Sequence, residues 1–152
     1  MLALCEAGQE SAWLASFRAQ TRLKTRYAEI DSYGHVSNVV YPDYLEVGRM
    51  DYLKLVGDPE PHLSIFPFEH VCAELHLRFI RPCYFDEELL VHTKTARLGR
   101  SSATLEQAIT QANDGSLRAI ATAIIVRNDG SSSKSWSQQQ RAALRAFDSL
   151  PA

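Results

Sequence analysis

The feature that most restricts the fold of this chain is one long amphipathic helix followed by a series of strand-like segments. Apolar residues recur at three- and four-residue steps from Val39 or Tyr41 to Val56, the spacing of a helix that buries one face. Pro42 falls in its first turn, where a missing N–H is tolerated. Gly57, with prolines at positions 59 and 61 behind it, predicts its end. Such a helix needs an apolar surface to pack against.

The first segment after this helix, residues 71–79, alternates between apolar and polar residues, which is typical of a half-buried strand, and three further strand-like runs follow it. The sequence Asn113-Asp114-Gly115 is a strong hairpin signal between the last two, and residues 99–100 join the two before. Ser137, with Gln140 three residues later, predicts a C-terminal helix that ends at about Phe147. The strand segments, including one before the long helix, span residues 22–27, 71–79, 88–98, 102–112 and 117–127. This order predicts an α+β fold in which a five-stranded antiparallel sheet wraps around the long helix.

The composition is that of one globular domain. With 152 residues, of which 45% are hydrophobic, the chain is long enough for a single core. We assign residues 21–152 to this domain and residues 1–20 to an N-terminal extension with a short amphipathic helix between Ser11 and Ala19. The net charge of -2 provides no basic field for nucleic acid, and no apolar run approaches the roughly 20 residues of a membrane span. Three cysteines without metal-site spacing favour reduced thiols and a cytoplasmic location.

The turn before the long helix carries the residues that suggest chemistry. Asp31 lies seven residues before Asn38, and Gly34 between them can take backbone angles that other residues avoid. The first N–H groups of a helix have no intrahelical acceptor and carry partial positive charge, which suits a developing oxyanion. A carboxylate beside them could attack an activated carbonyl or align a water against it. The alternative from the residues alone is that Asp31 only caps the turn by accepting backbone N–H bonds.

Seven residues around this turn form a longer pattern: Asp31, Gly34, Val36, Asn38, Tyr41, Glu46 and Arg49. They match Asp-x-x-Gly-x-Val-x-Asn-x-x-Tyr followed by Glu-x-x-Arg, and through it the chain resembles the hotdog-fold thioesterases of the 4-hydroxybenzoyl-CoA thioesterase type. The resemblance covers roughly residues 21–144 and includes Phe79-Ile80-Arg81-Pro82. Ser37 departs from it, since many relatives have asparagine there. It implies the hotdog fold, Asp31 as the catalytic carboxylate, and a thioester carbonyl polarised by the backbone N–H groups of Asn38 and Val39.

The resemblance also implies what the protein acts on and how it assembles. It implies hydrolysis of an acyl thioester carried by coenzyme A or by an acyl-carrier protein, without a cofactor. It further implies a homodimer or homotetramer with the site between subunits. The alternative function is that of a noncatalytic acyl-CoA-binding protein with the same fold. Asp31 argues against this alternative, because a binder gains nothing from a carboxylate buried beside a thioester carbonyl.

Substrate contacts are expected in two places. Tyr41 and Tyr44, with apolar strand residues such as Leu75 and Leu77, are expected to shape the acyl pocket. The second place is the turn at Gly99, whose basic and hydroxyl side chains could hold the phosphates of coenzyme A. A solvated hairpin tip is an equal alternative for this turn. Its candidate residues are Arg100, Ser101 and Ser102, with Arg97 beside them.

Two further groups of residues have both a functional and a structural interpretation. Four residues of metal-ligand type share one strand face, but side chains two positions apart on a strand are about 7 Å apart, so one ion reaches only neighbouring pairs. We therefore expect a polar sheet face and no metal site there. Glu46 and Arg49 are three apart on the helix and are expected to pair, with Glu46 kept as an alternative catalytic carboxylate. The four strand residues are His70, Cys72, Glu74 and His76.

His35 could protonate the leaving thiolate. A thiolate leaves without much protonation, however, so a structural hydrogen bond from this turn histidine is the preferred interpretation.

Overall fold

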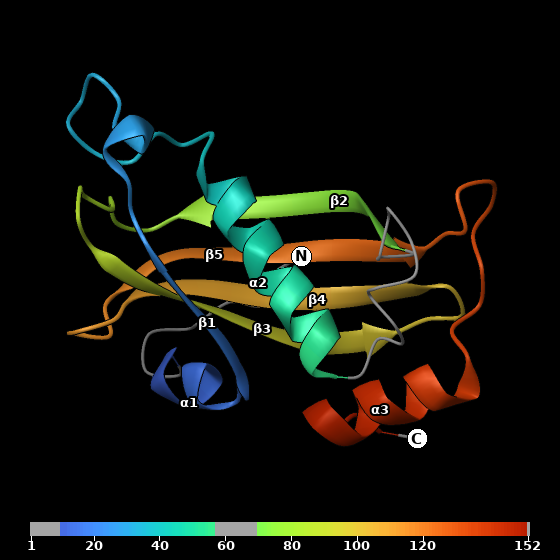
Figure 1. Cartoon of the computed structure of the whole chain (residues 1–152). Helices are drawn as coiled ribbons and strands as arrows, with labels where there is room; N and C mark the ends of the chain where they lie inside the picture. Colours follow the sequence, from blue (N-terminus) through green and yellow to red (C-terminus); the bar gives the residue numbers. More distant parts are fainter. Residues whose placement is uncertain (1–9, 57–69, 152) are drawn as a thin grey trace.

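The computed structural model describes residues 10–56 and 70–151, in which it has three α-helices and five strands (Figure 1). The strands form one antiparallel sheet in the order β1-β3-β4-β5-β2. A single 3-10 turn, η1 (Tyr27–Glu29), precedes the long helix. The helices are α1 (Glu10–Ala15), α2 (Tyr41–Leu55) and α3 (Gln138–Asp148), and the strands are β1 (Ala19–Lys24), β2 (His70–Phe79), β3 (Glu88–Leu98), β4 (Ser102–Gln111) and β5 (Leu117–Arg127).

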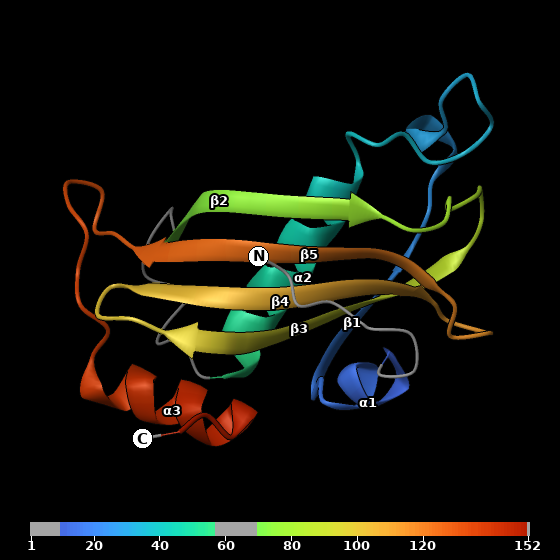
Figure 2. The ribbon, with the colours of Figure 1, turned by 180° about the vertical axis from the view of Figure 1, so that it is seen from behind.

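The long helix α2 crosses one face of the sheet (Figure 1). Its buried face packs on alternate residues of the central strands, because side chains two apart on a strand share a face. Leu45 of α2 is fully buried, as are Leu89 of β3 and Ile109 of β4 in the same cluster. On the opposite face, Phe17 after α1 packs against Ala108 and Ile120. Figure 2 shows α1 and α3 beside β1 and β3, away from β2.

The close approach of α2 to the sheet depends on Gly48. A Cβ atom at this position would lie 2.4 Å from Cγ1 and 3.1 Å from Cβ of Val91. Val91 is 1% exposed on β3, so it has no free space into which to move. The backbone of α2 can therefore reach this depth only because residue 48 has no side chain.

We expect Gly48→Ala to destabilise the protein by about 1 kcal/mol or more, although alanine favours the helix. Overpacking of a full core costs about 1–3 kcal/mol, whereas the gain in helix propensity is about 1 kcal/mol. Urea unfolding measures the change, with Val47→Ala on the exposed side of α2 as the control that stays within about 0.5 kcal/mol. A Gly48→Ala variant as stable as the natural protein would contradict this account of the helix–sheet contact.

The main sequence predictions for the fold are confirmed. The predicted α+β architecture, the five antiparallel strands and the long helix are all present, and Pro42 lies in the first turn of α2. The C-terminal helix begins as predicted, because the Ser137 hydroxyl accepts the Gln140 N–H at 3.1 Å while the Gln140 side chain accepts the Ser137 N–H at 3.0 Å. No helix in the described ranges has the length and apolar character that crossing a membrane requires.

Two predicted elements differ in extent. The first strand ends at Lys24 instead of continuing to Tyr27, because the Thr25 N–H and hydroxyl bond to the loop before β3 and the chain then turns into η1. The helix predicted between Ser11 and Ala19 is shorter, because Ala19 already belongs to β1. The division at residue 20 stays a prediction. Gly57, the loop 58–67 and Cys5 lie outside the described residues.

Candidate active site

The turn between Asp31 and His35 is a short closed loop. The Asp31 N–H donates to the His35 carbonyl at 2.9 Å, and the Gly34 N–H donates to the Asp31 carbonyl at 3.0 Å. Gly34 has φ +79°, a conformation that costs glycine little and other residues more. The loop therefore fixes the spacing between Asp31 and His35 through backbone bonds alone.

The loop is fastened to the body of the protein where it leads into α2. The Val36 N–H donates to the Cys83 carbonyl at 2.8 Å, and the Ser37 N–H donates to the Glu29 carbonyl at 2.8 Å. Val36 itself is fully buried. Because the two residues that follow the loop are anchored, the turn is held in place relative to the start of α2.

The start of α2 presents free backbone donors. The Val40 N–H donates to the Ser37 carbonyl at 3.0 Å, which closes a turn with Asn38 and Val39 in its middle. Within the part of the chain that the structure describes, the N–H groups of Asn38 and Val39 donate to no other residue. Two adjacent unpaired N–H groups at a helix N-terminus are suited to hold an oxyanion.

A pocket of about 240 Å³ opens beside these donors. One wall comes from the turn and from α2, and the other from the segment that follows β2. That second wall is held to β5, because the N–H groups of Ile80 and Arg81 donate to the Arg118 carbonyl at 2.8 and 3.0 Å, and Arg118 in turn donates to the Pro82 carbonyl. The lining residues are His35, Asn38, Tyr41, Phe79, Ile80, Arg81 and Pro82.

Asp31 is not among the residues that line this pocket. Its Oδ1 atom accepts the Tyr33 N–H at 2.9 Å, so the capping role considered from the sequence is present. Its Oδ2 atom is 3.6 Å from Nδ1 of His35, and 25% of the Asp31 side chain is exposed. His35, for which the sequence interpretation preferred a structural role, is the ionisable residue of this turn that lines the pocket.

The two tyrosines predicted to shape the acyl pocket have different positions. Tyr41 lines the pocket and is buried, and its hydroxyl accepts the Cys83 N–H at 3.1 Å. Burial raises the pKa of Tyr41, so its hydroxyl stays protonated at neutral pH. Tyr44 does not line this pocket, and its hydroxyl donates to Oε2 of Glu29 at 2.5 Å.

Two other expectations for this region need correction. Leu75 and Leu77 pack against the apolar core instead of lining the pocket. Phe79, Ile80 and Pro82 take that place, and the only sequence signal for them was that their segment resembled the family pattern.

The Glu46–Arg49 pair does not form: Arg49 is buried and donates to the Gln107 side chain at 3.0 Å, whereas Glu46 is exposed. Gln107 lies on β4, which sequence spacing along the helix cannot reveal.

Glu29 connects the turn region to α2 and gives a testable pH dependence. Burial by itself raises the pKa of its carboxyl group, but hydrogen bonds from Tyr44 and from the backbone and side chain of Arg26 outweigh burial, and the net pKa is lowered. A carboxylate whose pKa is lowered by folding contributes stability at neutral pH, and this contribution is lost as the pH falls through the folded-state pKa.

We therefore expect Glu29→Gln to cost about 2 kcal/mol at pH 7, the scale of hydrogen bonds to a charged group. The cost should shrink as the pH drops below the ordinary glutamate range, about pH 4. Chemical denaturation between pH 3 and 7 measures it, with the exposed Glu46→Gln as the matched control. Equal stability losses at both ends of that pH range would refute the assigned role of the charge.

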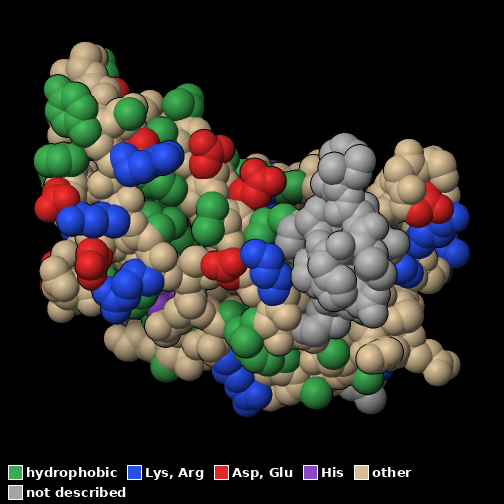
Figure 3. Space-filling view, viewed as in Figure 1, with side chains coloured by type: hydrophobic (Ala, Val, Ile, Leu, Met, Phe, Trp, Pro, Cys, Tyr) green, Lys and Arg blue, Asp and Glu red, His purple; other side chains and the backbone are tan. Residues whose placement is uncertain are grey.

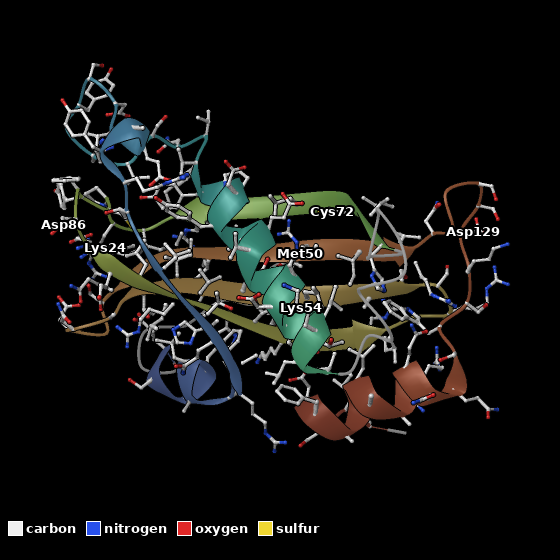
Figure 4. All side chains as sticks on the ribbon, in the orientation of Figure 1. Lys24, Met50, Lys54, Cys72, Asp86 and Asp129 are labelled. Carbon is white, nitrogen blue, oxygen red and sulfur yellow. The ribbon has the colours of Figure 1, made fainter. Side chains whose placement is uncertain are left out.

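The turn at Arg100, Ser101 and Ser102 lies at the opposite end of the sheet from the pocket. Figure 4 shows these two ends, with Asp86 before β3 at one and Asp129 after β5 at the other. The Ser101 carbonyl accepts the Arg127 N–H at 2.8 Å, which places this turn at the Asp129 end, whereas Phe79 and Pro82 lie at the Asp86 end. Within one chain, this turn and the pocket therefore do not form a single site.

The four strand residues of metal-ligand type do not converge. His70 stacks on the Trp136 ring at 5.0 Å, and His76 contacts Glu74 on the exposed surface. A register shift between Cys72 and Glu74 separates the two halves of the strand. Across residues 10–56 and 70–151, no three His, Cys, Asp or Glu side chains are close enough to hold a metal ion.

One helix wrapped by a five-stranded antiparallel sheet, with a pocket at the helix N-terminus, defines the class of protein as a hotdog fold. A family model described as the thioesterase superfamily matches residues 33–117, more than half of the chain, so the chain belongs to the thioesterase superfamily. This membership confirms the predicted class of enzyme, a thioester hydrolase. The finer resemblance to the 4-hydroxybenzoyl-CoA type stays a prediction.

Relatives and solved structures agree with this membership. The uncharacterized protein YsmA of Bacillus subtilis (strain 168) is 30% identical over 93 residues, which is 61% of this chain and 61% of YsmA, so the chain spans about three fifths of that relative. The long-chain acyl-CoA thioesterase FadM of Escherichia coli (strain K12) is 28% identical over 106 residues, 70% of this chain and 78% of FadM. A thioesterase from Thermus thermophilus, in complex with coenzyme A and Zn, is 25% identical with a TM-score of 0.76, over 90% of this chain and 98% of that one.

Proposed function

We propose that the protein hydrolyses the thioester bond of an acyl-CoA or acyl-carrier-protein substrate in the pocket at the start of α2. The observation that carries the proposal is the pair of N–H groups at Asn38 and Val39, which donate to no other described residue; Asn38 lines the pocket, and Val39 follows it. In many acyl-transfer enzymes, preorganised hydrogen-bond donors stabilise the negative charge that develops on the carbonyl oxygen. This stabilisation is often the largest single contribution to the lowering of the activation barrier.

The reaction follows from these groups. The thioester carbonyl oxygen lies against the N–H groups of Asn38 and Val39, which stabilise the oxyanion of the tetrahedral intermediate. Asp31 supplies the carboxylate, either by attacking the carbonyl to form a mixed anhydride or by activating the attacking water. Collapse of the intermediate breaks the C–S bond and releases the thiol. Water is the only co-reactant, so the reaction needs no cofactor.

The acyl group is proposed to occupy the pocket against Phe79, Ile80 and Pro82. Figure 3 shows several exposed hydrophobic side chains, among charged ones, at this end of the molecule, and the exposed fractions of Tyr27, Tyr33 and Val39 are 80%, 84% and 78%. An apolar rim and pocket suit the hydrocarbon part of an acyl thioester.

The phosphates of the carrier are proposed to bind the Arg100–Ser102 turn of a second subunit, because that turn is remote from the pocket of its own chain. This requires a homodimer as the minimal unit, alone or within a homotetramer. The edge strand β2 is ten residues long and its outer backbone groups have no strand partner in the described chain, which supports such an assembly. A cytoplasmic location stays a prediction.

A panel of acyl thioesters tests the proposed function. Thiol release from short, medium, long and aromatic acyl-CoAs, and from acyl-carrier protein, is followed with a thiol-reactive dye. We expect turnover with at least one acyl group, and the ratio between the two carriers identifies the carrier. Tight binding of acyl-CoA by calorimetry with no thiol release would instead support the noncatalytic binding protein.

A further inference from the structure

His35 is the ionisable residue of the Asp31 turn that faces the pocket. It lines the pocket, whereas Asp31 does not, and 31% of its side chain is exposed. The other ionisable side chains in the lining are Tyr41, from α2, and Arg81, after β2. Neither can accept a proton at neutral pH, because burial raises the pKa of Tyr41 and a guanidinium has no acceptor.

Three contacts fix the orientation of the His35 imidazole. Its Nδ1 atom is 3.2 Å from the Val36 carbonyl and 3.6 Å from Oδ2 of Asp31, and the Tyr33 ring stacks on it at 5.9 Å with an interplanar angle of 14°. Both partners of Nδ1 are acceptors, so the neutral ring carries its proton on Nδ1. The lone pair is then on Nε2.

That Nε2 atom is free to act as a base. In the described part of the chain, no side chain or backbone group bonds to it. An imidazole whose Nε2 is unengaged, and whose Nδ1 is within hydrogen-bond distance of a carbonyl and 3.6 Å from a carboxylate, is arranged like a general base with an orienting group. Asn38, whose N–H group donates to no other described residue, lines the same pocket as His35 and provides the place for the carbonyl.

We propose that His35 is a catalytic residue of this enzyme: it activates the hydrolytic water through Nε2, and Asp31 acts through it as a positioning residue. The inference rests on the proposed function and chooses the general-base route over attack by Asp31. The sequence analysis preferred a structural role for His35, because the sequence could not show which of His35 and Asp31 faces the pocket.

In the proposed step, His35 moves one proton from the attacking water to the leaving sulfur. Nε2 of His35 takes a proton from water while the water oxygen forms a bond to the thioester carbon. The carbonyl oxygen becomes an oxyanion held by the N–H groups of Asn38 and Val39. When the C–S bond breaks, the imidazolium returns its proton to the leaving sulfur, so the products are a carboxylic acid and a thiol. Asp31 stabilises the imidazolium that forms in between.

The experiment compares pH profiles of kcat/KM for the natural protein, His35→Gln and His76→Gln, the last a control on the exposed face of β2. The kcat/KM of the natural protein should fall on the acid side of its profile, where a general base becomes protonated. His35→Gln should lower kcat about a hundredfold or more, the scale of general-base catalysis, and abolish this acid limb. His76→Gln should retain both the activity and the limb.

Chemical rescue of the activity by added imidazole separates a catalytic role of His35 from a structural one. Added imidazole should restore part of the activity of His35→Ala, and should not affect Asp31→Asn. If His35→Gln retains activity within threefold while Asp31→Asn is inactive, this inference is overturned and the proposed function stands with Asp31 alone. If the natural protein releases no thiol from any thioester, both fail. Imidazole rescue of His35→Ala decides the question where His35→Gln does not fold.

Discussion

Replacing Asp31 with asparagine is expected to lower kcat for thioester hydrolysis about a hundredfold or more, with a much smaller change in KM. The substitution keeps the size of the side chain and an oxygen that can accept the Tyr33 N–H, which now lies 2.9 Å from Oδ1. It removes the negative charge beside His35 and the attacking oxygen that a nucleophilic route would need. Losses of this size are typical when one member of an acid–base or nucleophilic pair is removed.

The matched control for this prediction is Asp51→Asn, which removes a partly exposed carboxylate of α2 that pairs with Lys54 at 3.4 Å. It should retain full activity. Steady-state kinetics of both variants on the best acyl-CoA of the panel, with melting temperatures to verify folding, measure the difference. An Asp31→Asn enzyme with unchanged turnover would remove Asp31 from the mechanism.

Replacing Asn38 with proline is expected to reduce kcat by about a hundredfold to a thousandfold, the cost of one oxyanion-hole donor. Asn38 occupies the second position of the turn that the Val40 N–H closes on the Ser37 carbonyl, a position where proline is favoured. Proline there removes an N–H group that bonds to no other described residue. The change therefore removes a donor without removing any intramolecular hydrogen bond.

Asn38→Ala is the control that separates the backbone from the side chain. It keeps the N–H group and deletes the amide side chain, and we expect its kcat within a few-fold of the natural value. Both variants should bind a substrate analogue, since the N–H acts most strongly on the oxyanion. If Asn38→Ala were as impaired as Asn38→Pro, the side chain and not the backbone N–H would be the active group.

The fold was predictable because its signals are local. The three- and four-residue steps of α2 follow from the face that this helix buries, and the observed bounds of α2, β3, β4 and β5 agree with the predicted ones within a residue or two. The N-terminus of α3 was predictable for the same reason, since Ser137 and Gln140 cap each other over three residues.

The site was predictable only in part, because its geometry depends on contacts between distant segments. The Asp31–Asn38 turn could be located from the sequence. The hydrogen bonds from Tyr44 to Glu29 and from Arg49 to Gln107 could not, because they depend on how α2 packs against the turn and the sheet. The pocket wall after β2 is placed by Arg118 of β5, far away in sequence. Which of Asp31 and His35 faces the pocket is decided by one short loop, and no periodicity encodes it.

The most direct test of the central claim is a crystal structure with a nonhydrolysable acyl-CoA analogue, in which a methylene group replaces the thioester sulfur. We expect its carbonyl oxygen within about 2.7–3.1 Å of the N–H groups of Asn38 and Val39, its acyl group against Phe79 and Ile80, and Nε2 of His35 within reach of a water beside the carbonyl carbon. A carbonyl bound elsewhere, with the start of α2 facing only solvent, would contradict the account.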